Sequence, residues 1–172
     1  MYRWYEESAI CYAYLADVPS DDDLQAPESA FSKSRWFSRD WTLQELIAPS
    51  QVIFFSNNWK EIGRLRSLFS QVSKISRIDE AVSYDGSNLD MFSIAQRMSR
   101  ASQRSTTRVE DIAYCLFGIF DVNMPLLYGE GEKAFLRLQE EIMKRSNDQS
   151  LFAWTGCIAN PPPSSYSGFR ED

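Results

Sequence analysis

The chain has 172 residues, of which 44% are hydrophobic and 14% aromatic. This length and composition supply one sizeable hydrophobic core and exclude a disordered chain. With 18 basic against 24 acidic residues the formal net charge is -6, so nucleic acid and anionic membranes are poor candidates as partners. The chain contains no histidine, which excludes Ser-His and Cys-His catalysis and every histidine metal site.

The three cysteines are Cys11, Cys115 and Cys157, far apart and odd in number. Two of them lie in apolar stretches, which is typical of buried free thiols in a reducing compartment. The sequence shows no charged-then-apolar leader and no apolar run of roughly 18 residues, the length that a spanning helix needs. We therefore expect a cytoplasmic protein without a membrane span.

Residues 1–60 predict helix and strand in alternation. A helix is expected over 1–9, and apolar strands near 10–16 and 51–55. Since the first strand lacks clean alternation, we expect both of its faces to be covered. Between the strands, "TLQELIAP" predicts a two-turn helix that ends at Pro49. The order strand, helix, strand predicts two neighbouring parallel strands of an α/β fold.

The rest of the chain predicts a mainly α-helical region, because apolar residues recur at spacings of three and four. The expected elements are helices over 62–78, 93–105, 109–120 and 132–146, then a short strand over 150–154. The strongest pattern is that of 109–120, where Thr107 and Glu110 fit a capping box. Helices 109–120 and 132–146 are expected to pack together through Phe117, Phe120, Phe135 and Leu138. The Pro- and Ser-rich segment 158–172 predicts a disordered tail.

Two polar patterns have both a functional and a structural interpretation. In "YGEGEKAF" the glycines before Lys133 suggest a phosphate loop at a helix start. The spacing and the repulsive Glu130 and Glu132 favour a plain helix entry instead. The arginines at 97, 100, 104 and 108 could form an ion-pair network or a small anion pocket, although a solvated face is favoured. The three aspartates at 21–23 favour a solvated loop, so no metal site is expected.

Glu45 is the sharpest candidate for a functional residue. Thr42 precedes it by three positions, so a capping box in which Glu45 bonds back to the Thr42 N–H is the structural interpretation. The catalytic interpretation needs a carboxylate beside an aromatic wall, near the carboxyl ends of parallel strands. Trp41, four residues before Glu45, could supply that wall, and Trp36 is close in sequence.

Three long blocks resemble a known family. They are "MYRWYEESAICYAYLADVP", "SRWFSRDWTLQELIAPSQVIFF" and "TTRVEDIAYCLFGIFDVNMPLLYGEGEKAFLRLQEEIMKRS", followed by "SLFAW". In this order they resemble the HET (heterokaryon incompatibility) domain proteins of filamentous fungi. The resemblance implies that residues 1–60 are the C-terminal part of a HET domain. It also implies that 61–157 form the conserved helical domain of unknown function that follows it.

The resemblance implies a role in vegetative incompatibility, in which fusion of unlike cells triggers programmed cell death. It also implies a partial TIR-like (Rossmannoid) sheet. In TIR domains that cleave NAD, a glutamate follows a tryptophan as W-x-x-x-E, and "WTLQE" places Trp41 and Glu45 at that spacing. By this analogy Glu45 is a catalytic carboxylate, Trp41 is the wall of its pocket and NAD is a candidate substrate.

The chain departs from the family pattern in one respect. HET domains begin upstream with strands that this chain lacks, so we expect a truncated HET protein that is inactive as an enzyme alone. Two hypotheses follow from different classes of function. In one, the chain belongs to a NAD-consuming cell-death effector that uses Glu45. In the other, it is a non-catalytic signalling or assembly module that binds copies of itself or other incompatibility proteins.

Overall fold

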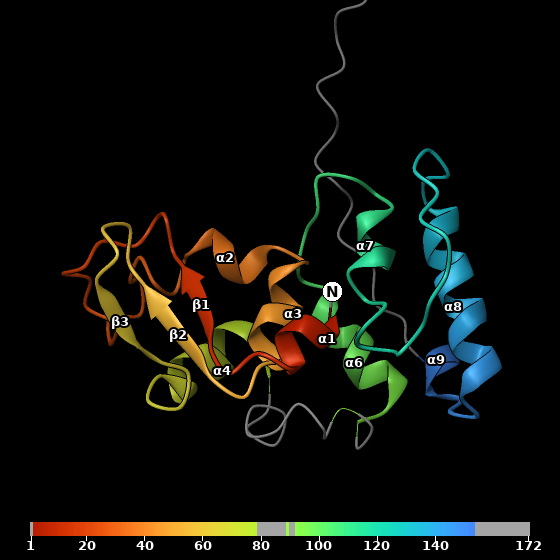
Figure 1. Ribbon diagram of the computed structural model, residues 1–172, viewed down its shortest axis with the longest axis horizontal. Coiled ribbons are helices and arrows are strands. Elements are labelled where there is room, and N and C mark those ends of the chain that lie inside the picture. Colours follow the sequence, from red (N-terminus) through yellow and green to blue (C-terminus); the bar gives the residue numbers. More distant parts are fainter. Residues whose placement is uncertain (1, 79–88, 90–91, 154–172) are drawn as a thin grey trace, which may run out of the picture.

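The computed structural model describes residues 2–78, 89 and 92–153. The predicted tail over 158–172 and Cys157 lie outside these residues. The strands lie at one end of the molecule and helix α8 at the other, with α1 and α3 between them (Figure 1). Buried residues from both ends belong to one continuous hydrophobic cluster. The domain boundary at residue 60 therefore stays a prediction from the family resemblance.

The sheet has three strands in the order β1-β2-β3. Strand β1 (Cys11–Tyr14) pairs in parallel with β2 (Val52–Phe55), with Cys11 opposite Val52. This confirms the α/β class and the predicted neighbouring parallel strands. Helix α3 (Thr42–Ile47) precedes Pro49 and connects the two strands as expected.

The third strand was not predicted. Strand β3 (Glu61–Arg64) runs antiparallel to β2, where the sequence pattern predicted the start of a helix. The reversal occurs at a tight turn in which the Ser56 N–H donates to the Lys60 carbonyl and Trp59 adopts a positive φ of 63°. Helix α4 is accordingly short, Phe69–Ser76. The apolar periodicity correctly predicted a helix after residue 64, but residues 61–64 form a strand instead of its first turn.

The two faces of β1 differ, contrary to the expectation that both are covered. Cys11 and Ala13 are buried, whereas Tyr12 is 61% and Tyr14 37% exposed. The inner face meets an aromatic cluster in which the Phe31 and Trp36 rings lie 5.5 and 5.6 Å from that of Phe54. Those edge-to-face contacts close the core over only one side of the sheet.

The remaining helices are short except for α8. Their bounds are α1 Tyr2–Glu6, α2 Arg35–Ser38, α6 Ile94–Ala101, α7 Asp111–Tyr114, α8 Lys133–Arg145 and α9 Ser150–Ala153. The expected strand over 150–154 is wrong, because residues 150–153 form α9. The Asp148 side chain accepts from the Ser150 N–H and from the Ile94 N–H, which fixes the start of α9 against α6.

The predicted helix over 109–120 is α-helical only at Asp111–Tyr114. The next turns tighten, since the N–H groups of Leu116 and Phe117 bond three residues back rather than four. Burial follows the predicted face all the same, and Leu116 is 1% exposed. Gly118 lies in this segment against Tyr2, whose Cβ would be 2.0 Å from any Cβ added there. Helices α7 and α8 are in contact, but α7 ends before Phe117 and Phe120, so the predicted contact through those two residues stays a prediction.

Candidate functional site

Glu45 is not a helix cap. The N-cap position of α3 is Trp41, which makes no side-chain capping bond, and Thr42 is already inside the helix. The Thr42 hydroxyl donates to the carbonyls of Trp36 and Arg39. The Glu45 carboxylate instead accepts from the Tyr5 hydroxyl at 3.2 Å and from the side chain of Trp36. The predicted capping box is therefore wrong, because the helix begins one residue too early, at Thr42 itself, for Thr42 to cap it.

Burial controls the acid–base properties around Glu45. It raises the pKa of the carboxyl, against hydrogen bonds from Tyr5 and Trp36 that lower it. It also raises the pKa of Tyr5 to about 12 and that of Cys11 to about 11, in both cases with help from the Glu45 charge. The group is therefore a carboxylate held by two aromatic donors, with the Tyr5 hydroxyl protonated at neutral pH.

The position of Glu45 relative to the sheet disfavours a dinucleotide site there. The Glu45 charge acts on Cys11, which is the first residue of β1 and pairs with the first residue of β2. Glu45 therefore lies toward the amino ends of the parallel strands. Ligands of open parallel sheets bind at the opposite, carboxyl ends. Trp41 is half-buried and packs against the core one turn before Glu45.

Tyr5 is the partner that sequence reasoning missed. It lies 40 residues from Glu45 and on another helix, so no local pattern indicated the contact. The bond links α1 to α3, which are in contact.

The favoured interpretation of the arginines as a solvated face is wrong. Arg100 and Arg104 are only 8% and 4% exposed. The guanidinium of Arg100 lies 4.1 Å from the centre of the Phe92 ring. Nη1 of Arg104 donates to the Arg39 carbonyl at 2.9 Å and to the Thr42 hydroxyl at 3.0 Å. Such burial is uncommon for arginine and requires specific partners.

The two outer arginines also contact aromatic rings. Arg97 donates from Nη1 to the Ile119 carbonyl at 3.0 Å and lies 5.0 Å from the Phe120 ring centre. Arg108 lies 4.8 Å from the Tyr128 ring centre. Among the described residues, the four arginines therefore contact different carbonyls and rings in different places.

Arg100 and Arg104 line a hollow of about 190 Å³, which we call the basic hollow. It is enclosed by the segment that leads into α2, by α2 itself, by the end of α4 and by the end of α6. Its lining residues are Ser32, Lys33, Ser34, Phe37, Ser38, Ile75, Ser76, Arg77, Ser99, Arg100, Gln103 and Arg104. Glu45 and Trp41 are not among them.

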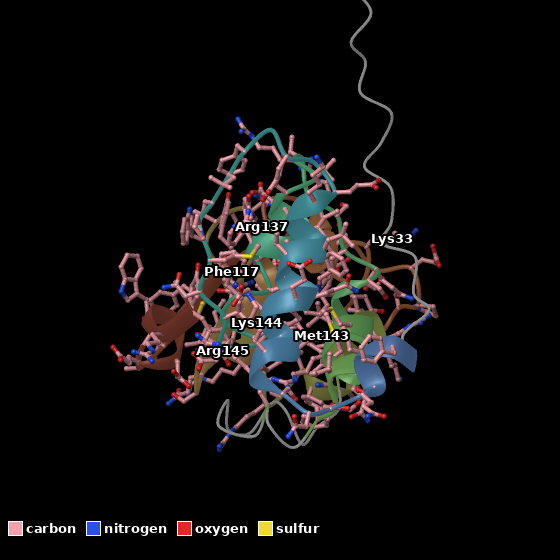
Figure 2. All side chains as sticks on the ribbon, turned by 90° about the vertical axis from the view of Figure 1, so that its right-hand side faces the viewer. Lys33, Phe117, Arg137, Met143, Lys144 and Arg145 are labelled. Carbon is pink, nitrogen blue, oxygen red and sulfur yellow. The ribbon has the colours of Figure 1, made fainter. Side chains whose placement is uncertain are left out.

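The glycine-rich loop before α8 is occupied by a carboxylate of the chain itself. Glu110 Oε1 accepts from the Gly129 N–H at 2.8 Å and from the Gly131 N–H at 3.0 Å. A bond with its own backbone N–H and these two bonds lower the pKa of Glu110. Arg137, which projects from α8 in Figure 2, pairs with Glu130. The loop is thus a helix entry, as favoured, but the capping box of Thr107 and Glu110 is wrong because Glu110 bonds to this loop instead.

Within ranges 2–78, 89 and 92–153, no group of three or more cysteine, aspartate and glutamate side chains could hold a metal ion. In the same part of the chain no helix is long and apolar enough to cross a membrane.

The fold and these contacts define a small α/β protein with a mixed sheet and buried arginines, and comparison with known proteins gives its relatives. The vegetative incompatibility protein HET-E-1 of Podospora anserina is 51% identical to the chain over 166 residues. That alignment covers 93% of this chain and 11% of HET-E-1. A family model described as a domain of unknown function (DUF8212) matches residues 133–169, from the start of α8 onward. No solved structure matches.

These matches are consistent with a fungal HET-related protein, and the family resemblance is confirmed. It spans about a tenth of the length of the curated relative that it matches.

Proposed function

We propose that this chain is a non-catalytic assembly module of a vegetative incompatibility protein, acting in fungal non-self recognition that leads to programmed cell death. The similarity to HET-E-1 supports the biological setting. The two buried free thiols, Cys11 and Cys115, suit a cytoplasmic location. Within that setting the chain contributes binding rather than chemistry.

The observation that carries the proposal is the outer face of the sheet. It presents Tyr12 and Trp59, 61% and 64% exposed, together with Tyr14 and Phe55. The rings are already packed on one another: Tyr14 stacks on Trp59 at 4.5 Å, and Tyr12 meets Phe55 edge-on at 5.5 Å. Pre-packed aromatic side chains lose little conformational entropy on binding and are enriched at the centres of protein interfaces.

The partner that we propose for this outer aromatic face is a second copy of the chain. A two-fold symmetric contact sets the same patch against itself, which a like-charged patch would oppose. The four aromatic side chains carry no charge, so they avoid the repulsion that a net charge of -6 creates elsewhere. Strand β1 is also an edge strand of the sheet, and edge strands can pair with a neighbouring chain.

The test is sedimentation equilibrium of the chain over a wide concentration range. We expect reversible dimers, and we expect Tyr12→Ser with Trp59→Asn to abolish them. Asparagine suits position 59 because it tolerates a positive φ. The matched control is Trp4→Asn, which removes a 77% exposed tryptophan from α1. A monomer at all concentrations, or a dimer that survives the double substitution, contradicts the proposal.

The second candidate function is cleavage of NAD, and one observation favours it. Glu45 is a half-buried carboxylate with a raised pKa beside aromatic side chains, a setting found at acid–base and ion-stabilising sites. Against it, Glu45 lies toward the amino ends of the strands and outside the basic hollow. We expect no measurable NAD cleavage by the 172-residue chain.

The deciding experiment joins a complete upstream HET segment to this chain. NAD consumption and cell death are compared with and without Glu45→Gln, which keeps a hydrogen-bond acceptor and removes the charge. A catalytic Glu45 predicts a fall of several orders of magnitude in NAD turnover. Our proposal predicts equal behaviour of the two chimeras.

A further inference from the structure

We propose that the basic hollow is a binding site for a phosphate group, either free phosphate or the phosphate of a small monoester. The chemistry of its lining is the first argument. Four cationic side chains border it, Lys33, Arg77, Arg100 and Arg104, together with five serines and Gln103. None of the described residues that line it is an aspartate or a glutamate. Lys33 already pairs with Glu28, which does not line the hollow, so the arginines supply the positive charge of the lining in a chain whose net charge is -6.

The buried guanidinium of Arg104 also supports an anion site. Its side chain is 4% exposed, and Nη1 is held by the Arg39 carbonyl and the Thr42 hydroxyl. Nη2 has no hydrogen-bond acceptor within the described part of the chain. A guanidinium that is buried with an unsatisfied N–H costs free energy, and a phosphate oxygen is an acceptor whose geometry it matches.

The neighbouring carboxyl does not neutralise this guanidinium fully. Among the acidic side chains, Asp40 has the largest effect on the pKa of Arg104. Burial, however, raises the pKa of Asp40 itself to about 7. Asp40 Oδ2 itself lacks a hydrogen-bond partner among the described residues. The Arg104 charge is therefore only partly balanced within the protein, which leaves it able to attract an anion.

Size limits the ligand. The volume of the basic hollow is about 190 Å³. Pockets that enclose a whole small molecule are larger, from about 300 Å³ upward. The basic hollow thus accommodates one phosphate group, and any organic remainder of a monoester extends into solvent past Lys33 and Arg77, which lie at exposed positions.

The structural alternative is that the arginines serve only the helix ends. Helices α4 and α6 both finish beside the hollow, and their carbonyl ends favour cations and oppose anions. Some hydroxyls are also engaged already, as Ser76 donates to the Val72 carbonyl at 2.7 Å. A binding experiment distinguishes the two explanations, because cations that only cap helices do not bind phosphate selectively.

The experiment is calorimetric titration of the chain with inorganic phosphate and with glycerol 2-phosphate, each against chloride at equal ionic strength. We expect saturable binding of at least one phosphate species. Arg77→Gly should weaken it at least tenfold without loss of folding, since Arg77 has a positive φ of 55° that glycine adopts readily. Lys74→Gln removes an exposed charge from the same helix, outside the hollow, and should leave binding unchanged.

Arg104→Gln should abolish phosphate binding, with folding checked by circular dichroism. If that variant does not fold, the loss of phosphate affinity is measured in Arg77→Gly and Lys33→Gln instead. Binding of either species supports the site. Binding of only one of them also identifies whether the ligand is free phosphate or a monoester. Equal heats for phosphate and chloride overturn the proposal, and so does an equal loss of affinity in Lys74→Gln and Arg77→Gly.

Discussion

The sheet and the junction between α3 and α6 are stabilised in different ways. The inner face of the sheet buries Phe31, Trp36 and Phe54 against one another without charge. The junction buries Asp40, Gln44 and Arg104, each less than 5% exposed, and leaves one polar atom of each without a partner among the described residues. The apolar region has a purely structural explanation. The polar one costs folding free energy, which is why a binding role belongs there.

The largest effect is expected on the apolar side of this comparison. Phe54→Ala should lower the free energy of unfolding by about 3–5 kcal/mol, because it leaves a large cavity among packed rings. Phe152→Ala is the matched control, since that side chain is 73% exposed. Urea denaturation of the two variants measures the difference. Equal losses would mean that the inner face is not the core.

Leu116→Ala extends the comparison to the tightened turn after α7. Leu116 is 1% exposed, so truncation should cost about 2–5 kcal/mol. Leu136→Ala, at a 58% exposed position on α8, should change little. Chemical denaturation decides between them, and a loss below about 1 kcal/mol for Leu116→Ala would remove this segment from the core.

Asp40 should make the polar junction sensitive to pH. Burial raises its pKa from 3.8 to about 7 in the native state, so between about pH 4 and 7 the folded chain binds a proton that the unfolded chain has lost. Its contribution to stability therefore falls as pH rises through this window. The full effect is at most about 4 kcal/mol, since one pKa unit corresponds to about 1.4 kcal/mol.

Asp40→Asn tests that prediction. The difference in unfolding free energy between the variant and the original chain should change in favour of the variant from pH 4 to pH 7 and level off above. Denaturation curves at four pH values are sufficient. A difference that stays constant with pH would show that Asp40 titrates normally in the folded state.

The smallest effect is expected at Glu45. Glutamine can still accept from the Tyr5 hydroxyl, so Glu45→Gln should cost about 1 kcal/mol or less. A double-mutant cycle with Tyr5→Phe should give a coupling of about 0.5–1.5 kcal/mol. Zero coupling would mean that the contact between α1 and α3 contributes nothing to stability.

Local patterns predicted what depends on neighbours in sequence. The parallel pair β1 and β2, the helix before Pro49 and the entry to α8 all follow from short apolar runs, a helix breaker and glycines. The hairpin to β3 was missed because it depends on the conformation of one turn around Trp59. Burial of Arg100 and Arg104 and the bond from Tyr5 to Glu45 were missed because they join residues far apart in sequence. No periodicity specifies which polar group a tertiary contact will bury.

Hydrogen exchange at two protein concentrations tests the proposed assembly role most directly, because it locates the contact as well as detecting it. If the outer aromatic face is the interface, protection should rise with concentration in β1 and in the turn at 56–60. It should stay constant in α8, although Leu136 and Met143 are also exposed on that helix, where Figure 2 labels Met143. Protection of β1 that is independent of concentration, or a rise confined to α8, would contradict the account.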